Sequence, residues 1–497
     1  MEEKIYYKST RGGQNGISAS EAILKGIAED GGLFVPSRIP KIDLKLKELA
    51  SMNYRELAYY VLSKFLVDFT EEELKNCVNN AYDNKFDTEE IAPMVKVGDS
   101  YFLELFHGPT LAFKDMALSI LPYLLTTSSK KQGLGKEIVI LTATSGDTGK
   151  AALEGFTNIP GIKIIVFYPE EGVSEIQKMQ MITHKGNNTH VIGIKGNFDD
   201  AQSGVKRIFR DEEFLKTLEE NNYVFSSANS INIGRLVPQV VYYFYAYLKL
   251  YSKGEIAEDE SINVVVPTGN FGNILAAYYA KEMGLPINKL ICASNDNKVL
   301  YDFISTGVYD KGREFYTTIS PSMDILISSN LERLLYALSG EDSKMVKELM
   351  DSLDSNGSYK INDAMRSNLK DFFGGYASEE ETKKAISDLY NKDKYIMDTH
   401  TAVAYSVNER YVKVSEDNTK AVVVSTASPY KFTYAVMNSI DNKYADYNDF
   451  QLVKEMSSLL NKEEPLAIKD INKREIVHKT VCNKEDMKKA VQEYLNF

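Results

Sequence analysis

The stretch Leu141–Phe156, LTATSGDTGKAALEGF, joins an apolar run to a helix-like pattern through a turn of small polar residues and glycines. With the preceding residues it gives KEIVILTAT, which is typical of a buried strand, and we expect a helix from Gly149 onward. The stretch Val265–Ala280, VVPTGNFGNILAAYYA, has the same layout. A strand that leads through such a turn into a helix is the repeating unit of an α/β fold.

This alternation continues on both sides of the two stretches. Further segments that we expect to be strands are IKIIVFYP, HVIGIKG, NYVFSSA, LICASN and AVVVSTA, and helix-like patterns such as VSEIQKMQMITH and FDDAQSGVKRIF separate several of them. Strands that are apolar along nearly their whole length indicate a parallel sheet with helices on both faces. The sequence therefore predicts the α/β class, with mostly parallel twisted sheets.

The flanking regions have a different texture. Residues 1–95 are rich in helix-like patterns, and we expect a mainly helical N-terminal region. The region around 340–395 contains the charged, helix-patterned ETKKAISDLYNKDK, which predicts a solvated helical insertion. The tail CNKEDMKKAVQEYLNF predicts one more amphipathic helix.

Composition restricts the class of protein. The 497 residues carry a formal net charge of −12, which disfavours nucleic acid as a partner. The three cysteines, Cys77, Cys292 and Cys482, form no CxxC pair and have no neighbouring histidine, so we expect neither a disulfide framework nor a metal site. The N-terminus lacks an apolar signal segment, and no window is apolar enough to span a membrane. We therefore expect a cytoplasmic protein that binds no membrane.

The two turns are candidate anion sites. Glycines allow a ligand to approach the backbone, and the start of a helix offers N–H groups that lack intrahelical partners. The first turn is not a phosphate loop of the kinase type, because Thr144 replaces its first glycine and Ala151 its magnesium-binding hydroxyl residue. The second turn is not a dinucleotide-binding motif either. Two such turns predict one ligand with two acidic groups, or two ligands with one acidic group each. The alternative is that both turns are ordinary βα connections that bind no ligand.

Lys114 lies in HGPTLAFKD, beside Leu111, Ala112 and Phe113. Apolar surroundings disfavour the charged form of a lysine, and a neutral amine can condense with an aldehyde. The aldehyde cofactor that also carries a phosphate is pyridoxal phosphate. A partly buried lysine and two anion sites thus point to pyridoxal chemistry on an amino acid. The residues alone leave open which turn holds which anion.

Five motifs resolve this choice by resemblance. The blocks FHGPTLAFKD, TATSGDTG, SSANSINIGR, PTGNFGN and STASPYKF, and the opening YKSTRG…SEAILKGIAEDGGLFVP, resemble threonine synthases of the longer bacterial and fungal form. The matches run in the family's order from about residue 6 to about residue 432. The resemblance implies the two-lobed tryptophan-synthase-β-like fold, with one lobe in residues 96–250 and the other in residues 251–497.

The resemblance also implies roles for individual residues. Lys114 matches the Schiff-base lysine, and Thr426 matches the hydroxyl residue that meets the pyridine nitrogen. The loop that holds the cofactor phosphate matches Gly269, Asn270, Phe271, Gly272 and Asn273. The residues that bind the substrate match Thr144, Ser145, Gly146, Asp147, Thr148, Asn229 and Arg235.

Some of these roles need a physical reason. Asp147 is an acidic residue inside an anion site, and our hypothesis is that it faces the substrate amine or orders the turn while backbone N–H groups bind the anion. We expect Arg235 to hold the substrate phosphate, because its fork of donors matches phosphate. Ser428 and Tyr430 stand where the family usually has histidine and alanine, so any role of that histidine is in doubt. His107 we interpret as a donor that stabilises its turn.

The reaction that the resemblance implies is the conversion of O-phospho-L-homoserine and water to L-threonine and phosphate, the last step of threonine biosynthesis. Lys114 would serve most of its proton transfers. One alternative is another pyridoxal phosphate lyase of the same fold, such as a threonine dehydratase. A further alternative is a non-catalytic relative that binds its ligand. We expect a monomer or a homodimer.

Overall fold

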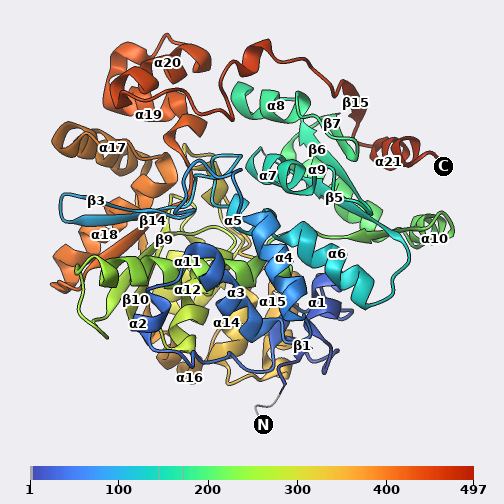
Figure 1. Cartoon of the computed structure of the whole chain (residues 1–497), viewed down its shortest axis with the longest axis horizontal. Coiled ribbons are helices and arrows are strands. Elements are labelled where there is room, and N and C mark those ends of the chain that lie inside the picture. The colour runs from blue at the N-terminus through green and yellow to red at the C-terminus, as the bar shows by residue number, and fades with distance from the viewer. Residues whose placement is uncertain (1–3, 145, 172) are drawn as a thin grey trace.

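The structure, a computed structural model, describes residues 4–144, 146–171 and 173–497, and its longer strands form two separate sheets (Figure 1). One sheet has the strand order β13 (Phe372–Tyr376), β10 (Ile287–Ser294), β9 (Ile262–Pro267), β14 (Ala421–Ser425), β4 (Ser100–Glu104) and β3 (Met94–Val97). Its neighbours run parallel except for the antiparallel pair β3 and β4.

The other sheet is wholly parallel. Its strand order is β15 (Thr480–Asn483), β7 (Thr189–Lys195), β6 (Ile162–Pro169), β5 (Glu137–Ala143) and β8 (Tyr223–Ser226). We call the parts of the molecule built on these sheets the six-stranded lobe and the five-stranded lobe. Two short antiparallel pairs, β1 (Tyr7–Ser9) with β2 (Phe34–Pro36) and β11 (Val308–Asp310) with β12 (Ser358–Lys360), lie outside them.

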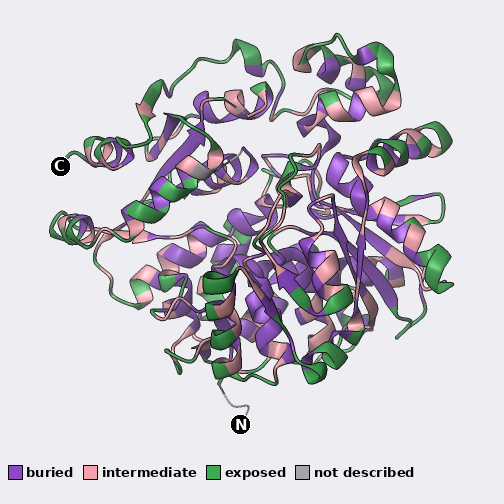
Figure 2. Cartoon of the chain, turned by 180° about the vertical axis from the view of Figure 1, so that it is seen from behind, coloured by how far each residue is buried: buried purple, intermediate pink, exposed green. Residues whose placement is uncertain are grey.

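The apolar strand sequences follow from burial on both faces. In β9, Val264 and Val266 pack into one hydrophobic cluster with α11 (Ile233–Ser252) and α12 (Gly272–Met283), whereas Val265 packs into another with α18 (Thr399–Ser415). Alternate residues of a strand point to opposite faces, so a strand covered on both sides is apolar along most of its length. Figure 2 shows the central strands of both sheets as buried and the outer helices with exposed faces. The expected α/β class with mostly parallel sheets is confirmed.

The carboxyl ends of neighbouring parallel strands bring the motifs together. The order β9, β14, β4 places the segments that follow Pro267, Ser425 and Glu104 side by side, and these segments contain GNFGN, TASPYKF and the lysine of HGPTLAFKD. Strand β5 of the other lobe leads into the SGDTG turn and α7 (Asp147–Phe156). Ligand sites in open α/β sheets lie at such ends.

Helices cover the two sheets and the remaining surface. In the first half of the chain they are α1 (Ala19–Lys25), α2 (Leu46–Leu49), α3 (Tyr54–Phe65), α4 (Glu71–Ala81), α5 (Asp115–Leu118), α6 (Leu121–Lys131), α8 (Glu175–Ile182), α9 (Phe198–Phe209) and α10 (Glu212–Glu220). In the second half they are α13 (Val299–Thr306), α14 (Leu331–Leu338), α15 (Ser343–Asn356), α16 (Asp363–Asn368), α17 (Glu379–Asp393), α19 (Thr433–Ile440), α20 (Asp449–Leu460) and α21 (Met487–Leu495), with short 3-10 turns between some of them.

Each sheet draws strands from distant parts of the chain. Strands β3 and β4 join the sheet built from residues after 260, and β15 of the tail joins the sheet of residues 137–226. The region around 340–395 contains β12 and β13 as well as the expected helices, and β13 is an edge strand of the six-stranded sheet. Its sequence, FFGGY, is short and contains two glycines, so it gives little strand signal. The division of the chain into consecutive domains stays a prediction. Within the described ranges, no helix combines the length and the hydropathy needed to cross a bilayer.

Candidate active site

Lys114 is held in place by the backbone of the STASPYKF motif. The Phe113 N–H donates to the Thr426 carbonyl at 2.8 Å, and the Ser428 N–H donates to the Leu111 carbonyl at 3.0 Å. This antiparallel bridge is followed at once by the short helix α5, which begins after Lys114. The lysine therefore projects from backbone that is fixed on both sides.

The surroundings of Lys114 favour its neutral form. Its side chain is 12% exposed, and its Nζ lies 3.6 Å from Oδ2 of Asp147. The pKa of Lys114 is lowered chiefly by burial, and the charges of Lys431 and Arg235 add to this against the attraction of Asp147. The sequence predicts a partly buried lysine with a lowered pKa at this position.

Asp147 forms the centre of a buried cluster. Its Oδ1 accepts from Lys431 Nζ at 2.8 Å and from Gln177 Nε2 at 2.8 Å. Its Oδ2 lies 3.5 Å from the Ser322 hydroxyl. Burial opposes ionisation, but Lys431 and Lys114 outweigh it and hold the pKa of Asp147 well below its usual range. Asp147 therefore orders side chains from both lobes.

The rest of the SGDTG turn is held internally. The Thr144 hydroxyl accepts from the N–H groups of Gly146 and Gly149, both at 2.9 Å, so it stabilises the turn. Gly146 has φ 137°, and a Cβ there would lie 2.6 Å from the Gln177 side chain. Thr148, in the first turn of α7, is half-buried. Ser145, a predicted substrate ligand, lies outside the described residues.

Two carbonyls of the GNFGN turn accept hydrogen bonds from residues outside the turn and its helix. The Gly269 carbonyl accepts from the Ser328 hydroxyl at 2.6 Å, and the Asn270 carbonyl accepts from the Asn330 N–H at 3.1 Å. Phe271 adopts the left-handed conformation, with φ 63°, directly before α12 begins at Gly272. The first N–H groups of α12 have no intrahelical acceptors, which makes this turn suited to an anion.

Asn273 adds a donor to the same turn. Its Oδ1 accepts from the hydroxyls of Tyr242 and Tyr243, at 2.6 and 2.5 Å. These bonds fix the amide so that its Nδ2 is the remaining donor. That Nδ2 is buried and has no hydrogen-bond partner in the part of the chain that the structure describes. A buried amide group of this kind normally has a partner, so it indicates a bound acceptor.

Arg235 is a buried guanidinium without a carboxylate partner among the described residues. It is 4% exposed, and one of its NH groups donates to the Ala228 carbonyl at 2.9 Å. Its Nε has no hydrogen-bond partner in the described part of the chain. Burial lowers the pKa of Arg235 to about 10. An unpaired buried cation is costly, so the arrangement favours an anionic ligand. Asn229 from the same motif is exposed, with its backbone in the turn before α11.

Ser428 and Tyr430 are the two residues that depart from the family pattern, and their side chains bond to groups other than Lys114. The Tyr430 hydroxyl bonds to Ser457 of α20 at 2.9 Å, and the Ser428 hydroxyl accepts from the Tyr430 N–H. Thr426 is buried, with its carbonyl in the bridge to Phe113. His107 bridges Asp87 and Glu104, which agrees with its interpretation as a turn-stabilising residue.

Several residues of the site were not identified from the sequence. Lys431 lies in the STASPYKF motif, and a second lysine in an apolar block is the same kind of signal as Lys114. Gln177 and Ser322 gave no signal, because their contacts with Asp147 arise from the packing of distant segments. His400 holds Ser322: its Nδ1 bonds to the buried Asp398, and its Nε2 accepts the Ser322 N–H at 3.1 Å.

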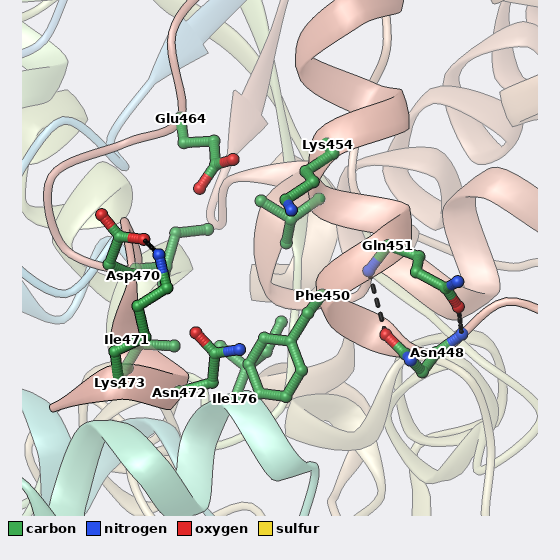
Figure 3. Close-up of a pocket in the computed structure, with 12 residues that line it drawn as sticks. Ile176, Asn448, Phe450, Gln451, Lys454, Glu464, Asp470, Ile471, Asn472 and Lys473 are labelled. Carbon is green, nitrogen blue, oxygen red and sulfur yellow. Dashed lines mark hydrogen bonds and ion pairs between the residues drawn. The ribbon is translucent and has the colours of Figure 1, made fainter.

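A separate cavity lies between α8 and α20 (Figure 3). It measures about 220 Å³ and is lined by Ile176, Asn448, Phe450, Gln451, Val453, Lys454, Glu464, Ile468, Asp470, Ile471, Asn472 and Lys473. None of the predicted site residues that the structure describes lines it. Its polar groups include the ion pair between Asp470 and Lys473, at 2.6 Å, and we assign no chemistry to it.

The residues present fit pyridoxal phosphate. A partly buried amine of lowered pKa suits an aldehyde, and the Asn273 amide and the first N–H groups of α12 suit a phosphate. A Cβ on Gly269 would lie 2.5 Å from the Ser322 carbonyl, so the turn tolerates no side chain there.

Comparisons with known proteins identify the family of the chain. Residues 6–82 match the family model "Threonine synthase N terminus", residues 90–428 match "Pyridoxal-phosphate dependent enzyme", and residues 401–481 match "Threonine synthase, C-terminal". Threonine synthase-like 1 of Homo sapiens is 43% identical over 85% of this chain, which spans 58% of the length of that relative. Threonine synthase of Pseudomonas aeruginosa is 40% identical over 86% of this chain and 89% of its own. The crystal structure of threonine synthase from Brucella melitensis, solved with pyridoxal phosphate bound, superposes with a TM-score of 0.87 at 36% identity over 99% of both chains.

Proposed function

Because the chain belongs to the threonine synthase family of pyridoxal-phosphate-dependent enzymes, we propose that it converts O-phospho-L-homoserine and water to L-threonine and phosphate. The observation that carries this proposal is the pairing of a partly buried amine with a buried guanidinium. Lys114 is an amine of lowered pKa, and Arg235, close enough to contribute to that shift, is a guanidinium without a carboxylate partner among the described residues. The first suits proton transfer and the second suits a phosphorylated substrate.

Pyridoxal phosphate would be held at three places. Lys114 would bind its aldehyde carbon, the Gly269–Asn273 turn its phosphate, and the Thr426 hydroxyl its ring nitrogen. When bound, the cofactor supplies a conjugated ring that accepts the electron pair released when a substrate C–H bond breaks. A neutral hydroxyl at the ring nitrogen does not hold that nitrogen protonated as a carboxylate would, so it makes the ring a gentler electron acceptor.

Lys114 carries the proton transfers. Its Nζ, once free, accepts the proton from the substrate Cα; a proton also leaves Cβ, and the Cγ–O bond breaks with its electron pair going to phosphate. Cγ gains a proton and becomes the methyl carbon, water adds its oxygen to Cβ, and Cα is protonated again. The pKa of Lys114 is lowered from its ordinary value, which brings it closer to the working pH at which an amine can both accept and return a proton.

The remaining residues bind and orient. Arg235 would hold the phosphate of the substrate, so that the leaving group departs into a site that already neutralises its charge. The N–H groups at the start of α7 would hold the substrate carboxylate, together with Thr148 and Ser145. Asn229, exposed at the turn before Arg235, would lie at the solvent side of the site.

The decisive assay compares two substrates. We expect phosphate release and threonine formation from O-phospho-L-homoserine by the protein loaded with pyridoxal phosphate. Release of a keto acid from threonine, without phosphate release from O-phospho-L-homoserine, would instead identify a dehydratase of the same fold. Binding of O-phospho-L-homoserine without either reaction would identify a non-catalytic relative.

The proposal extends to partners and compartment. The enzyme acts on a small molecule in the cytoplasm, as a monomer or homodimer, without nucleic acid or membrane as a partner. The net charge of −12 and the three free cysteines support this. Sedimentation velocity of the purified chain measures the oligomeric state.

A further inference from the structure

We infer that Lys431 is a positioning residue: it binds one oxygen of Asp147, and so prevents this carboxylate from pairing fully with Lys114. The inference rests on the proposed function in one respect, namely that Lys114 is the reactive amine. It assigns a task to a lysine that is fully buried beside the site and that the mechanism above does not use.

The geometry of Asp147 is asymmetric. Oδ1 receives two short hydrogen bonds, from Lys431 Nζ and Gln177 Nε2, each at 2.8 Å. From the residues that the structure describes, Oδ2 receives only long contacts, 3.6 Å from Lys114 Nζ and 3.5 Å from Ser322 Oγ. Two strong donors on one oxygen hold the carboxylate in a single orientation. Lys114 therefore lies near a carboxylate that is already occupied.

Lys431 is itself fixed. Its Nζ donates to the Thr110 carbonyl at 2.9 Å, and none of its side chain is exposed. Thr110 is in turn held by the buried Asp115, which accepts from the Thr110 N–H at 2.8 Å and from the Thr110 hydroxyl at 2.6 Å. Lys431 comes from the six-stranded lobe and Asp147 from the five-stranded lobe, so the ion pair also joins the two lobes across the site.

The electrostatic consequence has a definite sign. The charged groups that face the Lys114 amine are Asp147, Lys431 and Arg235, and Asp115 lies behind Lys431 with its pKa raised to about 6 by burial. Asp147 favours the ammonium form of Lys114, and the two cations disfavour it. Without Lys431, the carboxylate would be free to pair with Lys114 and the repulsion of one cation would be lost. Both changes would raise the pKa of Lys114.

The test measures Lys114 directly, without substrate. The full chain, with no pyridoxal phosphate added, is labelled with trace acetic anhydride between about pH 7 and 11, and acetylation of Lys114 is followed by peptide mass spectrometry. In Lys431→Gln we expect the pKa of Lys114 to rise by about one unit, so that labelling at a pH below both pKa values falls about tenfold. In Lys431→Arg, which keeps the charge and the donors, labelling should stay within about twofold of wild type.

The matched control is Lys150→Gln. Lys150 is another buried lysine, on the same helix α7 as Asp147, but it pairs with Glu154 at 2.7 Å and bonds His184 rather than Asp147. Its removal should leave the labelling of Lys114 unchanged. Equal effects of Lys150→Gln and Lys431→Gln would show a general loss of packing and would overturn the inference.

A second pair of variants tests whether Lys431 acts through Asp147. Asp147→Asn should increase the labelling of Lys114 about tenfold, and adding Lys431→Gln to it should change labelling by less than about threefold. A tenfold decrease within that pair would mean that Lys431 acts on Lys114 directly and would refute a positioning role. Neither variant leaves an unpaired buried carboxylate at position 147, so this comparison decides the question even if Lys431→Gln alone does not fold.

The labelling result is independent of turnover. A chain that makes no threonine but shows these shifts contradicts the proposed function and supports this inference. If the wild-type chain makes threonine but Lys114 is acetylated equally in wild type and Lys431→Gln, the proposed function is supported and this inference is contradicted.

Discussion

The backbone N–H of Phe113 donates a 2.8 Å hydrogen bond to the carbonyl of Thr426, which joins two motifs that lie far apart in the sequence. The residue after Phe113 is the predicted reactive lysine, and the side chain of Thr426 is the predicted partner of the ring nitrogen. One backbone bond therefore fixes the separation between the two ends of the proposed cofactor site. A substitution of Thr426 can remove its side-chain hydroxyl but leaves its backbone carbonyl in place.

We predict that Thr426→Ala lowers kcat about five- to tenfold and leaves KM nearly unchanged, because the loss of one neutral hydrogen bond has an effect of this size on a rate. Thr426→Ser keeps the hydroxyl and should restore most of the rate. Steady-state kinetics with O-phospho-L-homoserine check this. Wild-type kcat in Thr426→Ala would remove the assigned role of the hydroxyl.

Substitution of Arg235 by methionine should raise KM for O-phospho-L-homoserine about 10- to 100-fold, because a charge-assisted contact to phosphate is lost. The free energy of unfolding should fall little or rise, since the buried guanidinium has no carboxylate partner among the described residues to leave behind. Kinetics and urea denaturation measure the two effects. An unchanged KM would contradict phosphate binding by Arg235.

Arg333 provides the matched control for that variant. It is also buried, but its three kinds of donor reach the Phe34 carbonyl, Asn330 Oδ1 and the Ile231 carbonyl at 2.9, 2.5 and 2.6 Å. We expect Arg333→Met to destabilise the fold by about 2 to 4 kcal/mol, because it strands buried acceptors. The two variants should thus separate a ligand-binding arginine from a structural one.

Asn273→Asp should weaken the binding of pyridoxal phosphate. The carboxylate keeps the two acceptor bonds from Tyr242 and Tyr243 but replaces the unpartnered amide donor with negative charge. We predict an increase of at least about tenfold in the dissociation constant of the cofactor, because the lost donor and the added repulsion each oppose phosphate. Equilibrium dialysis and the thermal unfolding of cofactor-free protein check this. Equal cofactor affinity in the two proteins would place the phosphate elsewhere.

Much of this architecture could be predicted from local sequence. The strands β5, β6, β9 and β14 and the helices α9, α12 and α21 follow from apolar runs and helical periodicity, because both signals depend on neighbouring residues alone. The pairing of β3, β4, β13 and β15 with distant strands could not be predicted, because pairing over long separations depends on tertiary packing.

The site, like the fold, could be predicted from the sequence only in part. The sequence identified Lys114, Asp147 and Arg235 as candidates, and the structure places their charges near one another. It did not predict that Lys431, Gln177 and Ser322 converge on Asp147, because their segments meet only when the two lobes are packed together. The hydroxyl of Thr144, predicted to bind substrate, is committed to its own turn, and substrate binding by that residue stays a prediction.

The bridge formed by His107 predicts a pH dependence of stability. Burial alone would lower the pKa of His107, but the hydrogen bonds to Asp87 and Glu104 outweigh it and raise the pKa to about 9. A raised folded-state pKa stabilises the fold fully below the unfolded value of about 6.5, and this contribution is lost as the pH rises through about 9.

The variant His107→Gln isolates that contribution. Its free energy of unfolding should be about 2 kcal/mol below wild type near pH 6, a value reduced because Asp87 is largely exposed, and the gap should close by about pH 9.5. Urea denaturation at the two pH values measures it. A gap that stays constant or widens with rising pH would show that His107 is not charged in the folded protein.

The most direct test of the central claim is to load the full chain with pyridoxal phosphate, reduce it with borohydride and map the modified residue by peptide mass spectrometry. We predict a single modified peptide carrying the cofactor on Lys114, and no modification in Lys114→Met. Modification of Lys431, Lys150 or another lysine in its place, or no stable modification in the wild-type chain, would contradict the assignment of Lys114 as the reactive amine.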